Sequence, residues 1–546
     1  MEKASLGKRF GSVDLVVPLL LAIALLLFAW VSAWPIMSPA VVPASAPKTS
    51  FSAERAMGDL RVVAREPHGA GSEAQFRVRD YILAEAAAAG LKGEVQKGGI
   101  VENVIVRLPG SATTGDVLLS GHYDSHPPAP GAGDNGISVA AMLETMRVLR
   151  AGPTPRNDIV FLFTDGEELG WLGASAYIKE HPATKQTQLA LVFDGRPGNG
   201  PLTLRETSRG DAWLVQQIAA ARPPLWAASW LNAEERTDND TDFTAAFAPA
   251  GFMGVEIENM ARGTRYHTAG DTVDAISPGL VQAQGETMLR LARHFGGLDL
   301  GKARPSQDVT YFTVPSFAML VYPPWVTPAA AALATVALVT LVVVEWRRAR
   351  FSIVRSLLGA LAFLVALIVI TLISSRVWSQ LLATRPVTWE VGLNYADFAG
   401  SSLWIAGIMT VALILGILVL YGLSRRLDAV SLTISGLLVY ALVWIAAYLF
   451  LDSDNPVTHP PIVWPFVSGV AGLAILAFVR HRAWMAALLF LAAIPIFVLA
   501  VPAIVPEAFR PQENVWVPVL TMSLLLGVVV PQIAFITGRL SSATGV

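Results

Sequence analysis

Residues 159–178 read IVFLFTDGEELGWLGASAYI, an apolar run that ends abruptly in a cluster of acids. The run predicts a buried strand at 159–164, and the residues after the acids predict a helix at 170–180. Between them, Glu167 and Glu168 place two like charges side by side, which is unfavourable unless a positive charge lies against them. Acidic residues also suit the first turn of a helix. The doublet alone therefore predicts either a solvated helix start or a metal site.

Short apolar strands alternate with helices throughout residues 51–300. Further strands are predicted at 101–108, 117–120, 189–193 and 252–257. Further helices are predicted at 53–64, 73–89, 136–149, 211–221 and 278–295. This alternation is typical of an α/β domain whose central sheet is mostly parallel and flanked by helices. The sites of such domains lie beyond the carboxyl ends of the strands.

Four of the predicted strands are followed by residues that can bind a metal or transfer a proton. These are His122 with Asp124, the doublet Glu167–Glu168, Asp194, and the pair Tyr266–His267, while Asp134 precedes a helix. A hydrolytic metal site needs neutral imidazoles and carboxylates, with a position left for water. Two ions about 3.5–4 Å apart need a shared ligand, and the two oxygens of a carboxylate such as Asp134 suit that role. One glutamate of the doublet can bind metal while its neighbour transfers protons.

Four motifs carry a family resemblance: GHYDS, GAGDNGISVAAMLE, FTDGEELGWLGASAY and YHTAGDT. In order and spacing they resemble those of the co-catalytic di-zinc aminopeptidases. The segment REPHGAGSEAQFRVRDYI at 65–82 resembles the membrane-bound branch of that family, the endoplasmic reticulum metallopeptidases and vacuolar membrane proteases. That branch also carries a multi-span C-terminal region. The resemblance covers residues 55–300 well and the rest only in outline.

Carried over position by position, the resemblance implies two zinc ions and a role for eight residues. His122 and Asp194 would hold one ion, Glu168 and His267 the other, Asp134 would bridge them, Glu167 would be the general base, Asp124 would orient His122, and Tyr266 would stabilise the oxyanion. A cis peptide bond at Asp134–Asn135 is also implied. The eukaryotic membrane relatives tend to have Glu where this chain has Asp194. Because the soluble enzymes have Asp there, we still expect two metals.

Other polar residues near these motifs have plainer interpretations. Asp165 suits a turn or a helix start, and His126, four residues after His122, suits a flexible loop near the site. The acidic stretch at 234–243 resembles the family's loop near the substrate, although a solvated loop explains it nearly as well. Asp242 is the residue of that stretch that we would test.

Apolar spans outside this domain indicate a membrane protein. The uncharged stretch at 15–34 follows Lys3, Lys8 and Arg9 and is long enough to cross a membrane as a helix. We interpret it as an uncleaved signal anchor, because a cleaved signal has an apolar core of about 7–15 residues. Seven further spans are predicted at 325–345, 354–375, 402–424, 430–451, 461–479, 484–505 and 515–537. Arginines gather in alternate loops, which predicts that both termini are cytoplasmic.

Four segments follow from these patterns. They are a cytoplasmic N-terminus and anchor at 1–34, a linker at 35–50, an extracytoplasmic zinc peptidase domain at 51–308, and a membrane domain at 309–546. The alanine-rich, cysteine-free composition suits a bacterial inner membrane with the peptidase domain in the periplasm. The net charge of -2 argues against nucleic acid as a partner. The predicted spans have no ionisable residue at their centres, which argues against a transporter.

The motif set predicts a membrane-anchored di-zinc metallopeptidase that hydrolyses peptides with metal-activated water, most simply an aminopeptidase. Within the enzyme class, a dipeptidase, a carboxypeptidase-like enzyme or a one-zinc cyclotransferase is an alternative. Outside it, the alternative is a non-catalytic receptor or scaffold of the same fold, but relatives of that kind lose ligands, and none is missing here. The expected partners are a peptide substrate and the lipid bilayer, and a homodimer is compatible with the sequence.

Overall fold

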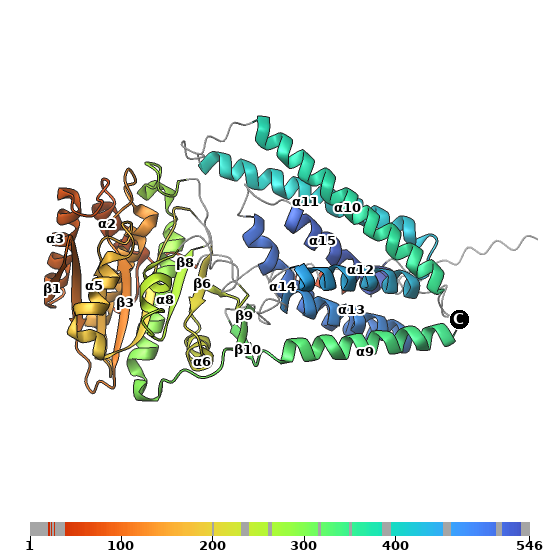
Figure 1. The fold of residues 1–546 in the computed structure, drawn as a ribbon, viewed down its shortest axis with the longest axis horizontal. Coiled ribbons are helices and arrows are strands. Elements are labelled where there is room, and N and C mark those ends of the chain that lie inside the picture. Colours follow the sequence, from red (N-terminus) through yellow and green to blue (C-terminus); the bar gives the residue numbers. More distant parts are fainter. Residues whose placement is uncertain are drawn as a thin grey trace, which may run out of the picture. The chain divides into compact units, whose positions relative to one another are not determined.

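The computed structural model describes most of the chain and divides it into two compact units. One unit contains Trp34–Pro324 with Pro386–Ser402, and the other contains Met1–Ala33, Trp325–Arg385 and Leu403–Val546. Figure 1 draws both units. The described residues are 20, 21, 23, 24, 27, 39–198, 201–230, 240–259, 265–314, 318–348, 352–384, 395–450, 460–508 and 516–536.

The first unit is built on a sheet with the strand order β1-β2-β4-β3-β5-β8-β6-β7. Its strands are β1 Gly93–Gly98, β2 Val101–Leu108, β3 Asp116–His122, β4 Ile159–Thr164, β5 Thr187–Phe193, β6 Leu202–Thr207, β7 Trp226–Ala227 and β8 Gly254–Asn259. The four central strands, β4, β3, β5 and β8, are parallel. Antiparallel pairs flank them, since β2 pairs with both β1 and β4, and β6 pairs with β8. The predicted α/β class is therefore confirmed, with antiparallel strands added outside the parallel centre.

Helices cover both faces of this sheet, and the side chains of β4 show why. Phe161 and Phe163 belong to the larger core cluster, whereas Val160 and Leu162 belong to a smaller one. Successive side chains of a strand point to opposite faces, so a wholly apolar strand needs cover on both. Around the larger cluster lie α2 Ala53–Val63, α3 Glu73–Ala88, α4 Ile137–Ala151, α6 Ala212–Ala221 and α8 Pro278–Gly297. Around the smaller one lie α5 Leu172–Glu180 and the π-helical turn η4 Asp242–Phe247.

A hairpin after α8 also belongs to this unit. It consists of β9 Thr310–Val314 and β10 Ala318–Tyr322, which pair antiparallel. Val309 and Tyr311 are buried in the larger core cluster. The compact unit therefore continues to Pro324, beyond residue 308, where the sequence predicts the domain boundary.

Gly285 of α8 offers a test of this packing. A Cβ added there would lie 1.8 Å from the Phe51 ring, whereas a Cβ at Gly58 of α2 would meet nothing within 4 Å. We expect Gly285→Ala to lower the free energy of unfolding by about 1–3 kcal/mol, because overpacking forces side chains and backbone to shift. Gly58→Ala is the matched control and should be neutral or stabilising by up to about 1 kcal/mol. Thermal unfolding of both variants in detergent checks this, and equal stability would contradict the packing.

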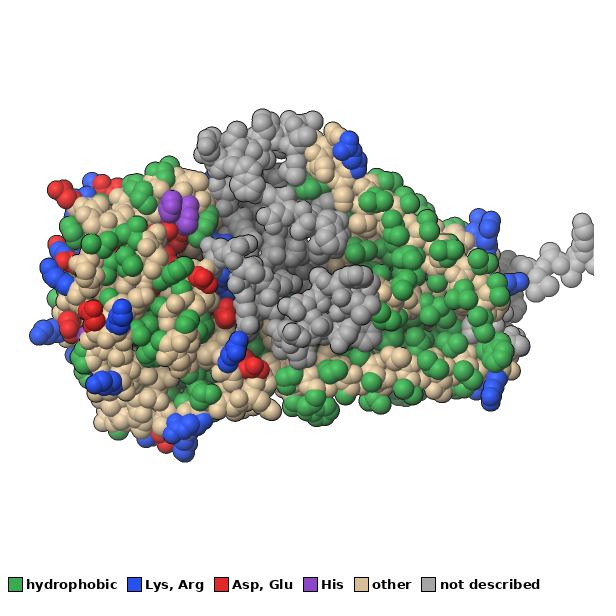
Figure 2. Space-filling view, viewed as in Figure 1, with side chains coloured by type: hydrophobic (Ala, Val, Ile, Leu, Met, Phe, Trp, Pro, Cys, Tyr) green, Lys and Arg blue, Asp and Glu red, His purple; other side chains and the backbone are tan. Residues whose placement is uncertain are grey.

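The second unit consists of apolar helices. Among the described residues, four helices are long and apolar enough to cross a membrane, or five if a pair bent by 62° counts as one span. The four are α9 Val326–Arg347, α10 Ile353–Thr384, α11 Tyr395–Ser424 and α13 Pro460–Phe478, and the bent pair is α15 Trp516–Val528 with α16 Val530–Ile536. Figure 2 shows hydrophobic side chains spread over the described part of this unit on the face in view. Large apolar surfaces of this kind mark contact with a membrane or a partner.

Several predicted spans are described only in part. The span at 15–34 lies largely outside the described residues. The spans at 430–451 and 484–505 correspond to α12 Ala429–Phe450 and α14 Arg482–Ala508, whose fully described parts are the shorter apolar helices Ala429–Val443 and Ala483–Ile496.

Candidate metal centre

The parallel strands bring the predicted ligands to one edge of the sheet. His122 is the last residue of β3 and pairs in register with Thr164, the last residue of β4. The doublet Glu167–Glu168 therefore begins three residues beyond the level of His122. Asp194 directly follows β5, the other neighbour of β3. Three adjacent strands thus end in imidazole and carboxylate groups, as the rule for parallel sheets requires.

Asp134 lies between two of the predicted histidine ligands. Its Oδ1 is 3.1 Å from His122 Nε2, and its Oδ2 is 3.1 Å from His267 Nε2. It belongs to the short π-helical turn Ala132–Gly136 that precedes α4, and its peptide bond to Asn135 is cis, as the resemblance implies. Burial alone would raise the pKa of Asp134, but hydrogen bonds from the two histidines lower it below its usual range. One carboxylate thus contacts both imidazoles, which is the arrangement that a bridging ligand needs.

Asp271, a residue without a predicted role, holds this turn in place. Its two carboxylate oxygens accept the backbone N–H groups of Gly133 at 2.7 Å and Asp134 at 3.1 Å. It is fully buried, and burial raises its pKa to about 7. Asp271 lies inside the motif YHTAGDT, which indicates that it is near the site. The sequence does not indicate which backbone groups it contacts.

We expect Asp271→Asn to weaken metal binding by about 10–100-fold, the usual cost of losing a group that supports a ligand. An asparagine can accept only one of the two N–H groups, and its NH₂ would face the other donor. Competition with a chelator measures this affinity. Asp274→Asn, at an exposed position three residues on, is the control and should bind metal as the parent chain does. An unchanged affinity in Asp271→Asn would contradict its supporting role.

Asp124 contacts both His122 and the glutamate doublet. Its backbone carbonyl accepts from His122 Nδ1 at 3.0 Å, while its carboxylate Oδ1 lies 3.5 Å from that nitrogen. The carboxylate accepts the backbone N–H groups of Glu167 at 3.1 Å and Glu168 at 3.2 Å. The residue that was predicted to orient His122 therefore also fixes the backbone of the doublet.

The two glutamates of the doublet face different histidines. Glu168 Oε2 lies 3.2 Å from His267 Nε2, and Glu167 Oε2 lies 3.9 Å from His122 Nε2. Burial raises the pKa of Glu168 to about 7, although its hydrogen bond with His267 opposes the rise. Burial also raises the pKa of Glu167 well above its usual range; His122 opposes this, and Asp194 and Asp242 add to it. The two glutamates therefore lie beside different histidines, Glu167 near His122 and Glu168 near His267.

Asp194 and His122 complete one side of the centre. Asp194 Oδ1 is 3.5 Å from His122 Nε2 and accepts the backbone N–H of Gly195 at 2.7 Å. His122 is almost fully buried. Burial disfavours its protonated form, but Glu167 and the carboxylates of Asp124, Asp134 and Asp194 outweigh this and raise its pKa well above the usual range.

His267 completes the other side. Its backbone has a φ of 57°, a left-handed conformation that costs energy for a residue with a side chain. Its ring stacks on Tyr266 with centroids 3.8 Å apart, and Arg196 lies over the Tyr266 ring at 5.0 Å. Tyr266 is therefore next to the predicted metal ligand His267. Burial raises its pKa above the usual range, and Asp134 adds to that rise.

Two further residues near the centre had weaker sequence signals. Asp242 is buried, accepts a hydrogen bond from Thr164 Oγ1 at 2.5 Å, and has its pKa raised to about 7 by burial. Residues 231–239, which contain the first six residues of the acidic stretch, lie outside the described residues. His126 stacks on His267 with centroids 4.1 Å apart and 5° between the ring planes. The predicted loop histidine thus lies at the centre itself.

The donor atoms fit divalent metal ions. Two groups of described residues could each hold an ion, with ligand atoms within 4.8 Å of one another: His122, Asp134 and Asp194 in one, and His126, Glu168 and His267 in the other. Within the described part of the chain, Glu168 Oε1 and His126 Nδ1 are buried without a hydrogen-bond partner. Buried polar atoms rarely stay unpaired, and mixed carboxylate and imidazole sets are typical of hydrolytic zinc sites.

Comparison with known proteins agrees with this geometry. Residues 103–292 match the family described as Peptidase family M28. The similarity to this family covers about a third of the chain. The match includes all eight site residues predicted from the sequence, from His122 to His267.

The same part of the chain is similar to a vacuolar membrane protease and to an endoplasmic reticulum metallopeptidase. It is 33% identical over 235 residues to a vacuolar membrane protease of Candida albicans, covering 40% of this chain and 27% of that protein. It is 28% identical over 231 residues to endoplasmic reticulum metallopeptidase 1 of Mus musculus, covering 41% of this chain and 26% of that protein. The aligned part of the chain thus spans about a quarter of the length of these relatives.

Two solved enzyme structures are similar to part of this chain. A zinc aminopeptidase from Bacillus subtilis is 16% identical, with a TM-score of 0.39, and the match covers 47% of this chain and 98% of that one. A glutaminyl cyclase from Porphyromonas gingivalis is 20% identical, with a TM-score of 0.37, and covers 44% of this chain and 97% of that one.

Proposed function

We propose that this chain is a membrane-anchored di-zinc metallopeptidase that removes N-terminal residues from peptides. The observation that carries the proposal is the contact of the Asp134 carboxylate with both His122 and His267 at 3.1 Å. His122 and Asp194 would hold one zinc ion, Glu168 and His267 the other, and Asp134 both. Bound there, zinc ions polarise a peptide carbonyl and lower the pKa of water toward neutrality.

We assign the proton transfer, the orientation of the ligands and the stabilisation of the oxyanion to residues of the chain. Glu167 accepts the proton of the attacking water and returns it to the leaving amine nitrogen. Its carboxylate lies 3.9 Å from His122 Nε2 and belongs to neither metal group, so it is available as a base. Asp124 fixes the backbone of the doublet and holds His122 Nδ1 through its carbonyl. We assign Tyr266, beside His267, to the oxyanion that forms on the substrate.

A digest of a peptide library by the purified full chain in detergent with zinc tests the reaction class. We expect stepwise release of N-terminal residues from unblocked peptides and none from N-acetylated ones. Release of C-terminal residues, or cleavage of dipeptides only, would instead identify a carboxypeptidase-like enzyme or a dipeptidase. Loss of ammonia from peptides with N-terminal glutamine would identify a cyclotransferase, and bound metal without turnover a receptor or scaffold.

We also propose that the peptidase domain faces away from the cytoplasm, in a bacterial inner membrane, with both termini inside. The alternation of arginine-rich loops between the apolar spans supports this orientation. A fluorescent protein that folds only in the cytoplasm should be bright when fused after residue 546. An alkaline phosphatase fusion that is active at the same point would reverse the orientation.

A further inference from the structure

His126 lies at the metal centre on a segment that is firmly held. Ser125 Oγ accepts the backbone N–H of His68 at 2.9 Å and donates to the carbonyl of Ala129 at 2.9 Å. The backbone N–H of Ala129 donates in turn to the carbonyl of His126 at 2.6 Å. Ser125, His68 and Ala129 are all buried. The backbone on both sides of His126 is therefore held by hydrogen bonds to buried residues.

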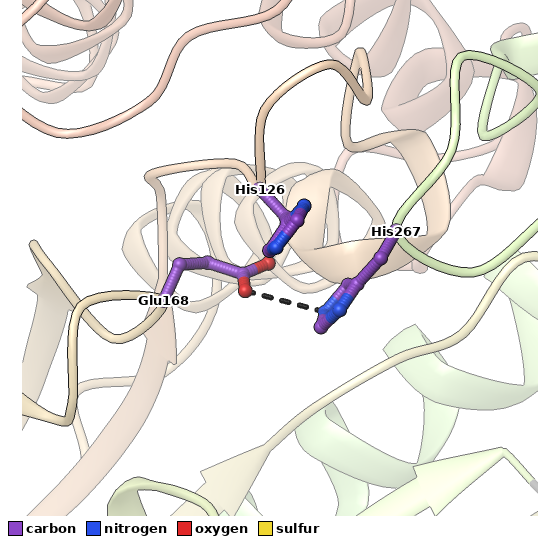
Figure 3. Close-up of side chains that lie close together, drawn as sticks. All are labelled: His126, Glu168 and His267. Carbon is purple, nitrogen blue, oxygen red and sulfur yellow. Dashed lines mark ion pairs between the residues drawn. The ribbon is translucent and has the colours of Figure 1, made fainter. Parts of the chain in front are cut away.

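The side chain of His126 lies close to two proposed zinc ligands. Figure 3 shows His126, Glu168 and His267 converging from three separate loops. Each offers one ligand atom within 4.8 Å of the others. In addition, His126 Nδ1 is a buried nitrogen that has no hydrogen-bond partner among the described residues. A buried ring nitrogen without a partner, next to a carboxylate and a second imidazole, matches the ligand types of zinc.

We propose that His126 is a third side-chain ligand of the second zinc ion, beside Glu168 and His267, with Asp134 as the shared fourth. This rests on the proposed function, which assigns that ion only two ligands and the bridge. The rings of His126 and His267 are parallel at present, 4.1 Å apart. Ring lone pairs lie in the ring planes, so two parallel rings do not aim at one point. The His126 ring therefore turns about its side-chain bonds to bind, while its fixed backbone stays in place.

The additional ligand makes the two metal sites unequal. The second site then has two imidazoles, Glu168 and the shared Asp134, whereas the first has only His122 as a nitrogen ligand, with Asp194 and the same Asp134. Zinc prefers nitrogen over carboxylate oxygen as a borderline-soft ion. The second site should consequently fill first and release its ion last, and the first site should keep the more open coordination.

Replacing His126 by phenylalanine separates ligation from stacking, because phenylalanine keeps a ring against His267 and removes both nitrogens. His181→Phe is the matched control: the His181 ring stacks on Tyr177 at 5.1 Å with 15° between the planes and belongs to neither metal group. The full chain is purified in detergent, and chelator competition gives the affinity of each zinc ion. Cobalt substitution adds an absorption spectrum that reports on ligand number.

We expect the parent chain and His181→Phe to bind two zinc ions, and His126→Phe to bind the tighter one at least about 100-fold more weakly, since losing even an outer-shell partner costs about 10–100-fold. The cobalt spectrum of that site should change as well. Unchanged affinities and spectrum in His126→Phe, or equal weakening of both ions, would overturn the assignment while leaving the di-zinc proposal intact. Failure of the parent chain to bind zinc would instead overturn the proposed function, and this inference with it.

Discussion

Replacing Glu167 by glutamine should lower kcat/KM by about 10²–10⁴-fold while two metal ions remain bound. That is the usual contribution of a positioned general base, and glutamine keeps the shape of the side chain but accepts no proton. Glu167 lies 3.9 Å from His122 Nε2 and belongs to neither metal group, so its loss should spare metal binding. Peptide hydrolysis and metal content, measured on the same sample, check both halves of this prediction.

The neighbouring glutamate provides the matched control. Glu168→Gln changes the same chemical group one residue on, but that carboxylate lies 3.2 Å from His267 and belongs to a metal group. The Glu168→Gln variant should lose bound metal as well as activity. If Glu167→Gln also lost metal, or if it kept full activity, the division of the doublet into a base and a ligand would be wrong.

Replacing Asp134 by asparagine should weaken both metal ions together and reduce hydrolysis to background. The substitution removes the negative charge and one of the two oxygens that face His122 and His267. Because the side chain is shared, each site should lose more than about 100-fold in affinity, beyond the 10–100-fold cost of a supporting group. In a competition with a chelator, both metal ions should be released at lower chelator concentration from this variant than from the parent chain.

Glu144→Gln separates this effect from the general cost of changing a buried carboxylate. Glu144 is also buried, but it pairs with Arg55 at 2.6 Å and Arg147 at 3.0 Å and belongs to neither metal group. The Glu144→Gln substitution should lower thermal stability and leave the metal content at the value of the parent chain. An Asp134→Asn chain that lost only one ion would rule out a shared ligand.

The sequence predicted the central strands and the acidic and histidine residues at their ends for one physical reason. A parallel strand with helices on both faces is apolar throughout, as in IVFLFT of β4, so it is visible without knowledge of its neighbours. The chain then has to place its polar residues where the strand stops. The positions just after such apolar runs therefore identify His122, Glu168 and Asp194 as candidate site residues.

Strand β6 was missed because its polar residues are neutralised by distant parts of the chain. Its sequence, LTLRET, suggests a solvated segment, yet Arg205 is buried, with Nη1 2.7 Å from Glu256 and 3.0 Å from Glu258 of β8. Burying a charge is costly unless a partner pairs with it. Local pattern cannot reveal that pairing, because the partners lie about fifty residues away in the sequence.

The contacts of Asp271 and His126 could not be predicted from local sequence patterns either. Asp271 acts on the backbone of Gly133 and Asp134, far earlier in the chain, and His126 meets Glu168 and His267 only after three loops have been assembled. An alternating or helical pattern reports which face of an element is buried. It carries no information on which loops meet at the edge of a sheet.

The most direct test of the central claim is a metal count on the purified full chain and its Asp134→Asn variant, made by elemental analysis after exposure to zinc and removal of the excess. The account predicts two zinc ions per chain in the parent protein and loss of both in the variant. No bound metal in the parent, or two ions retained in Asp134→Asn, would contradict it.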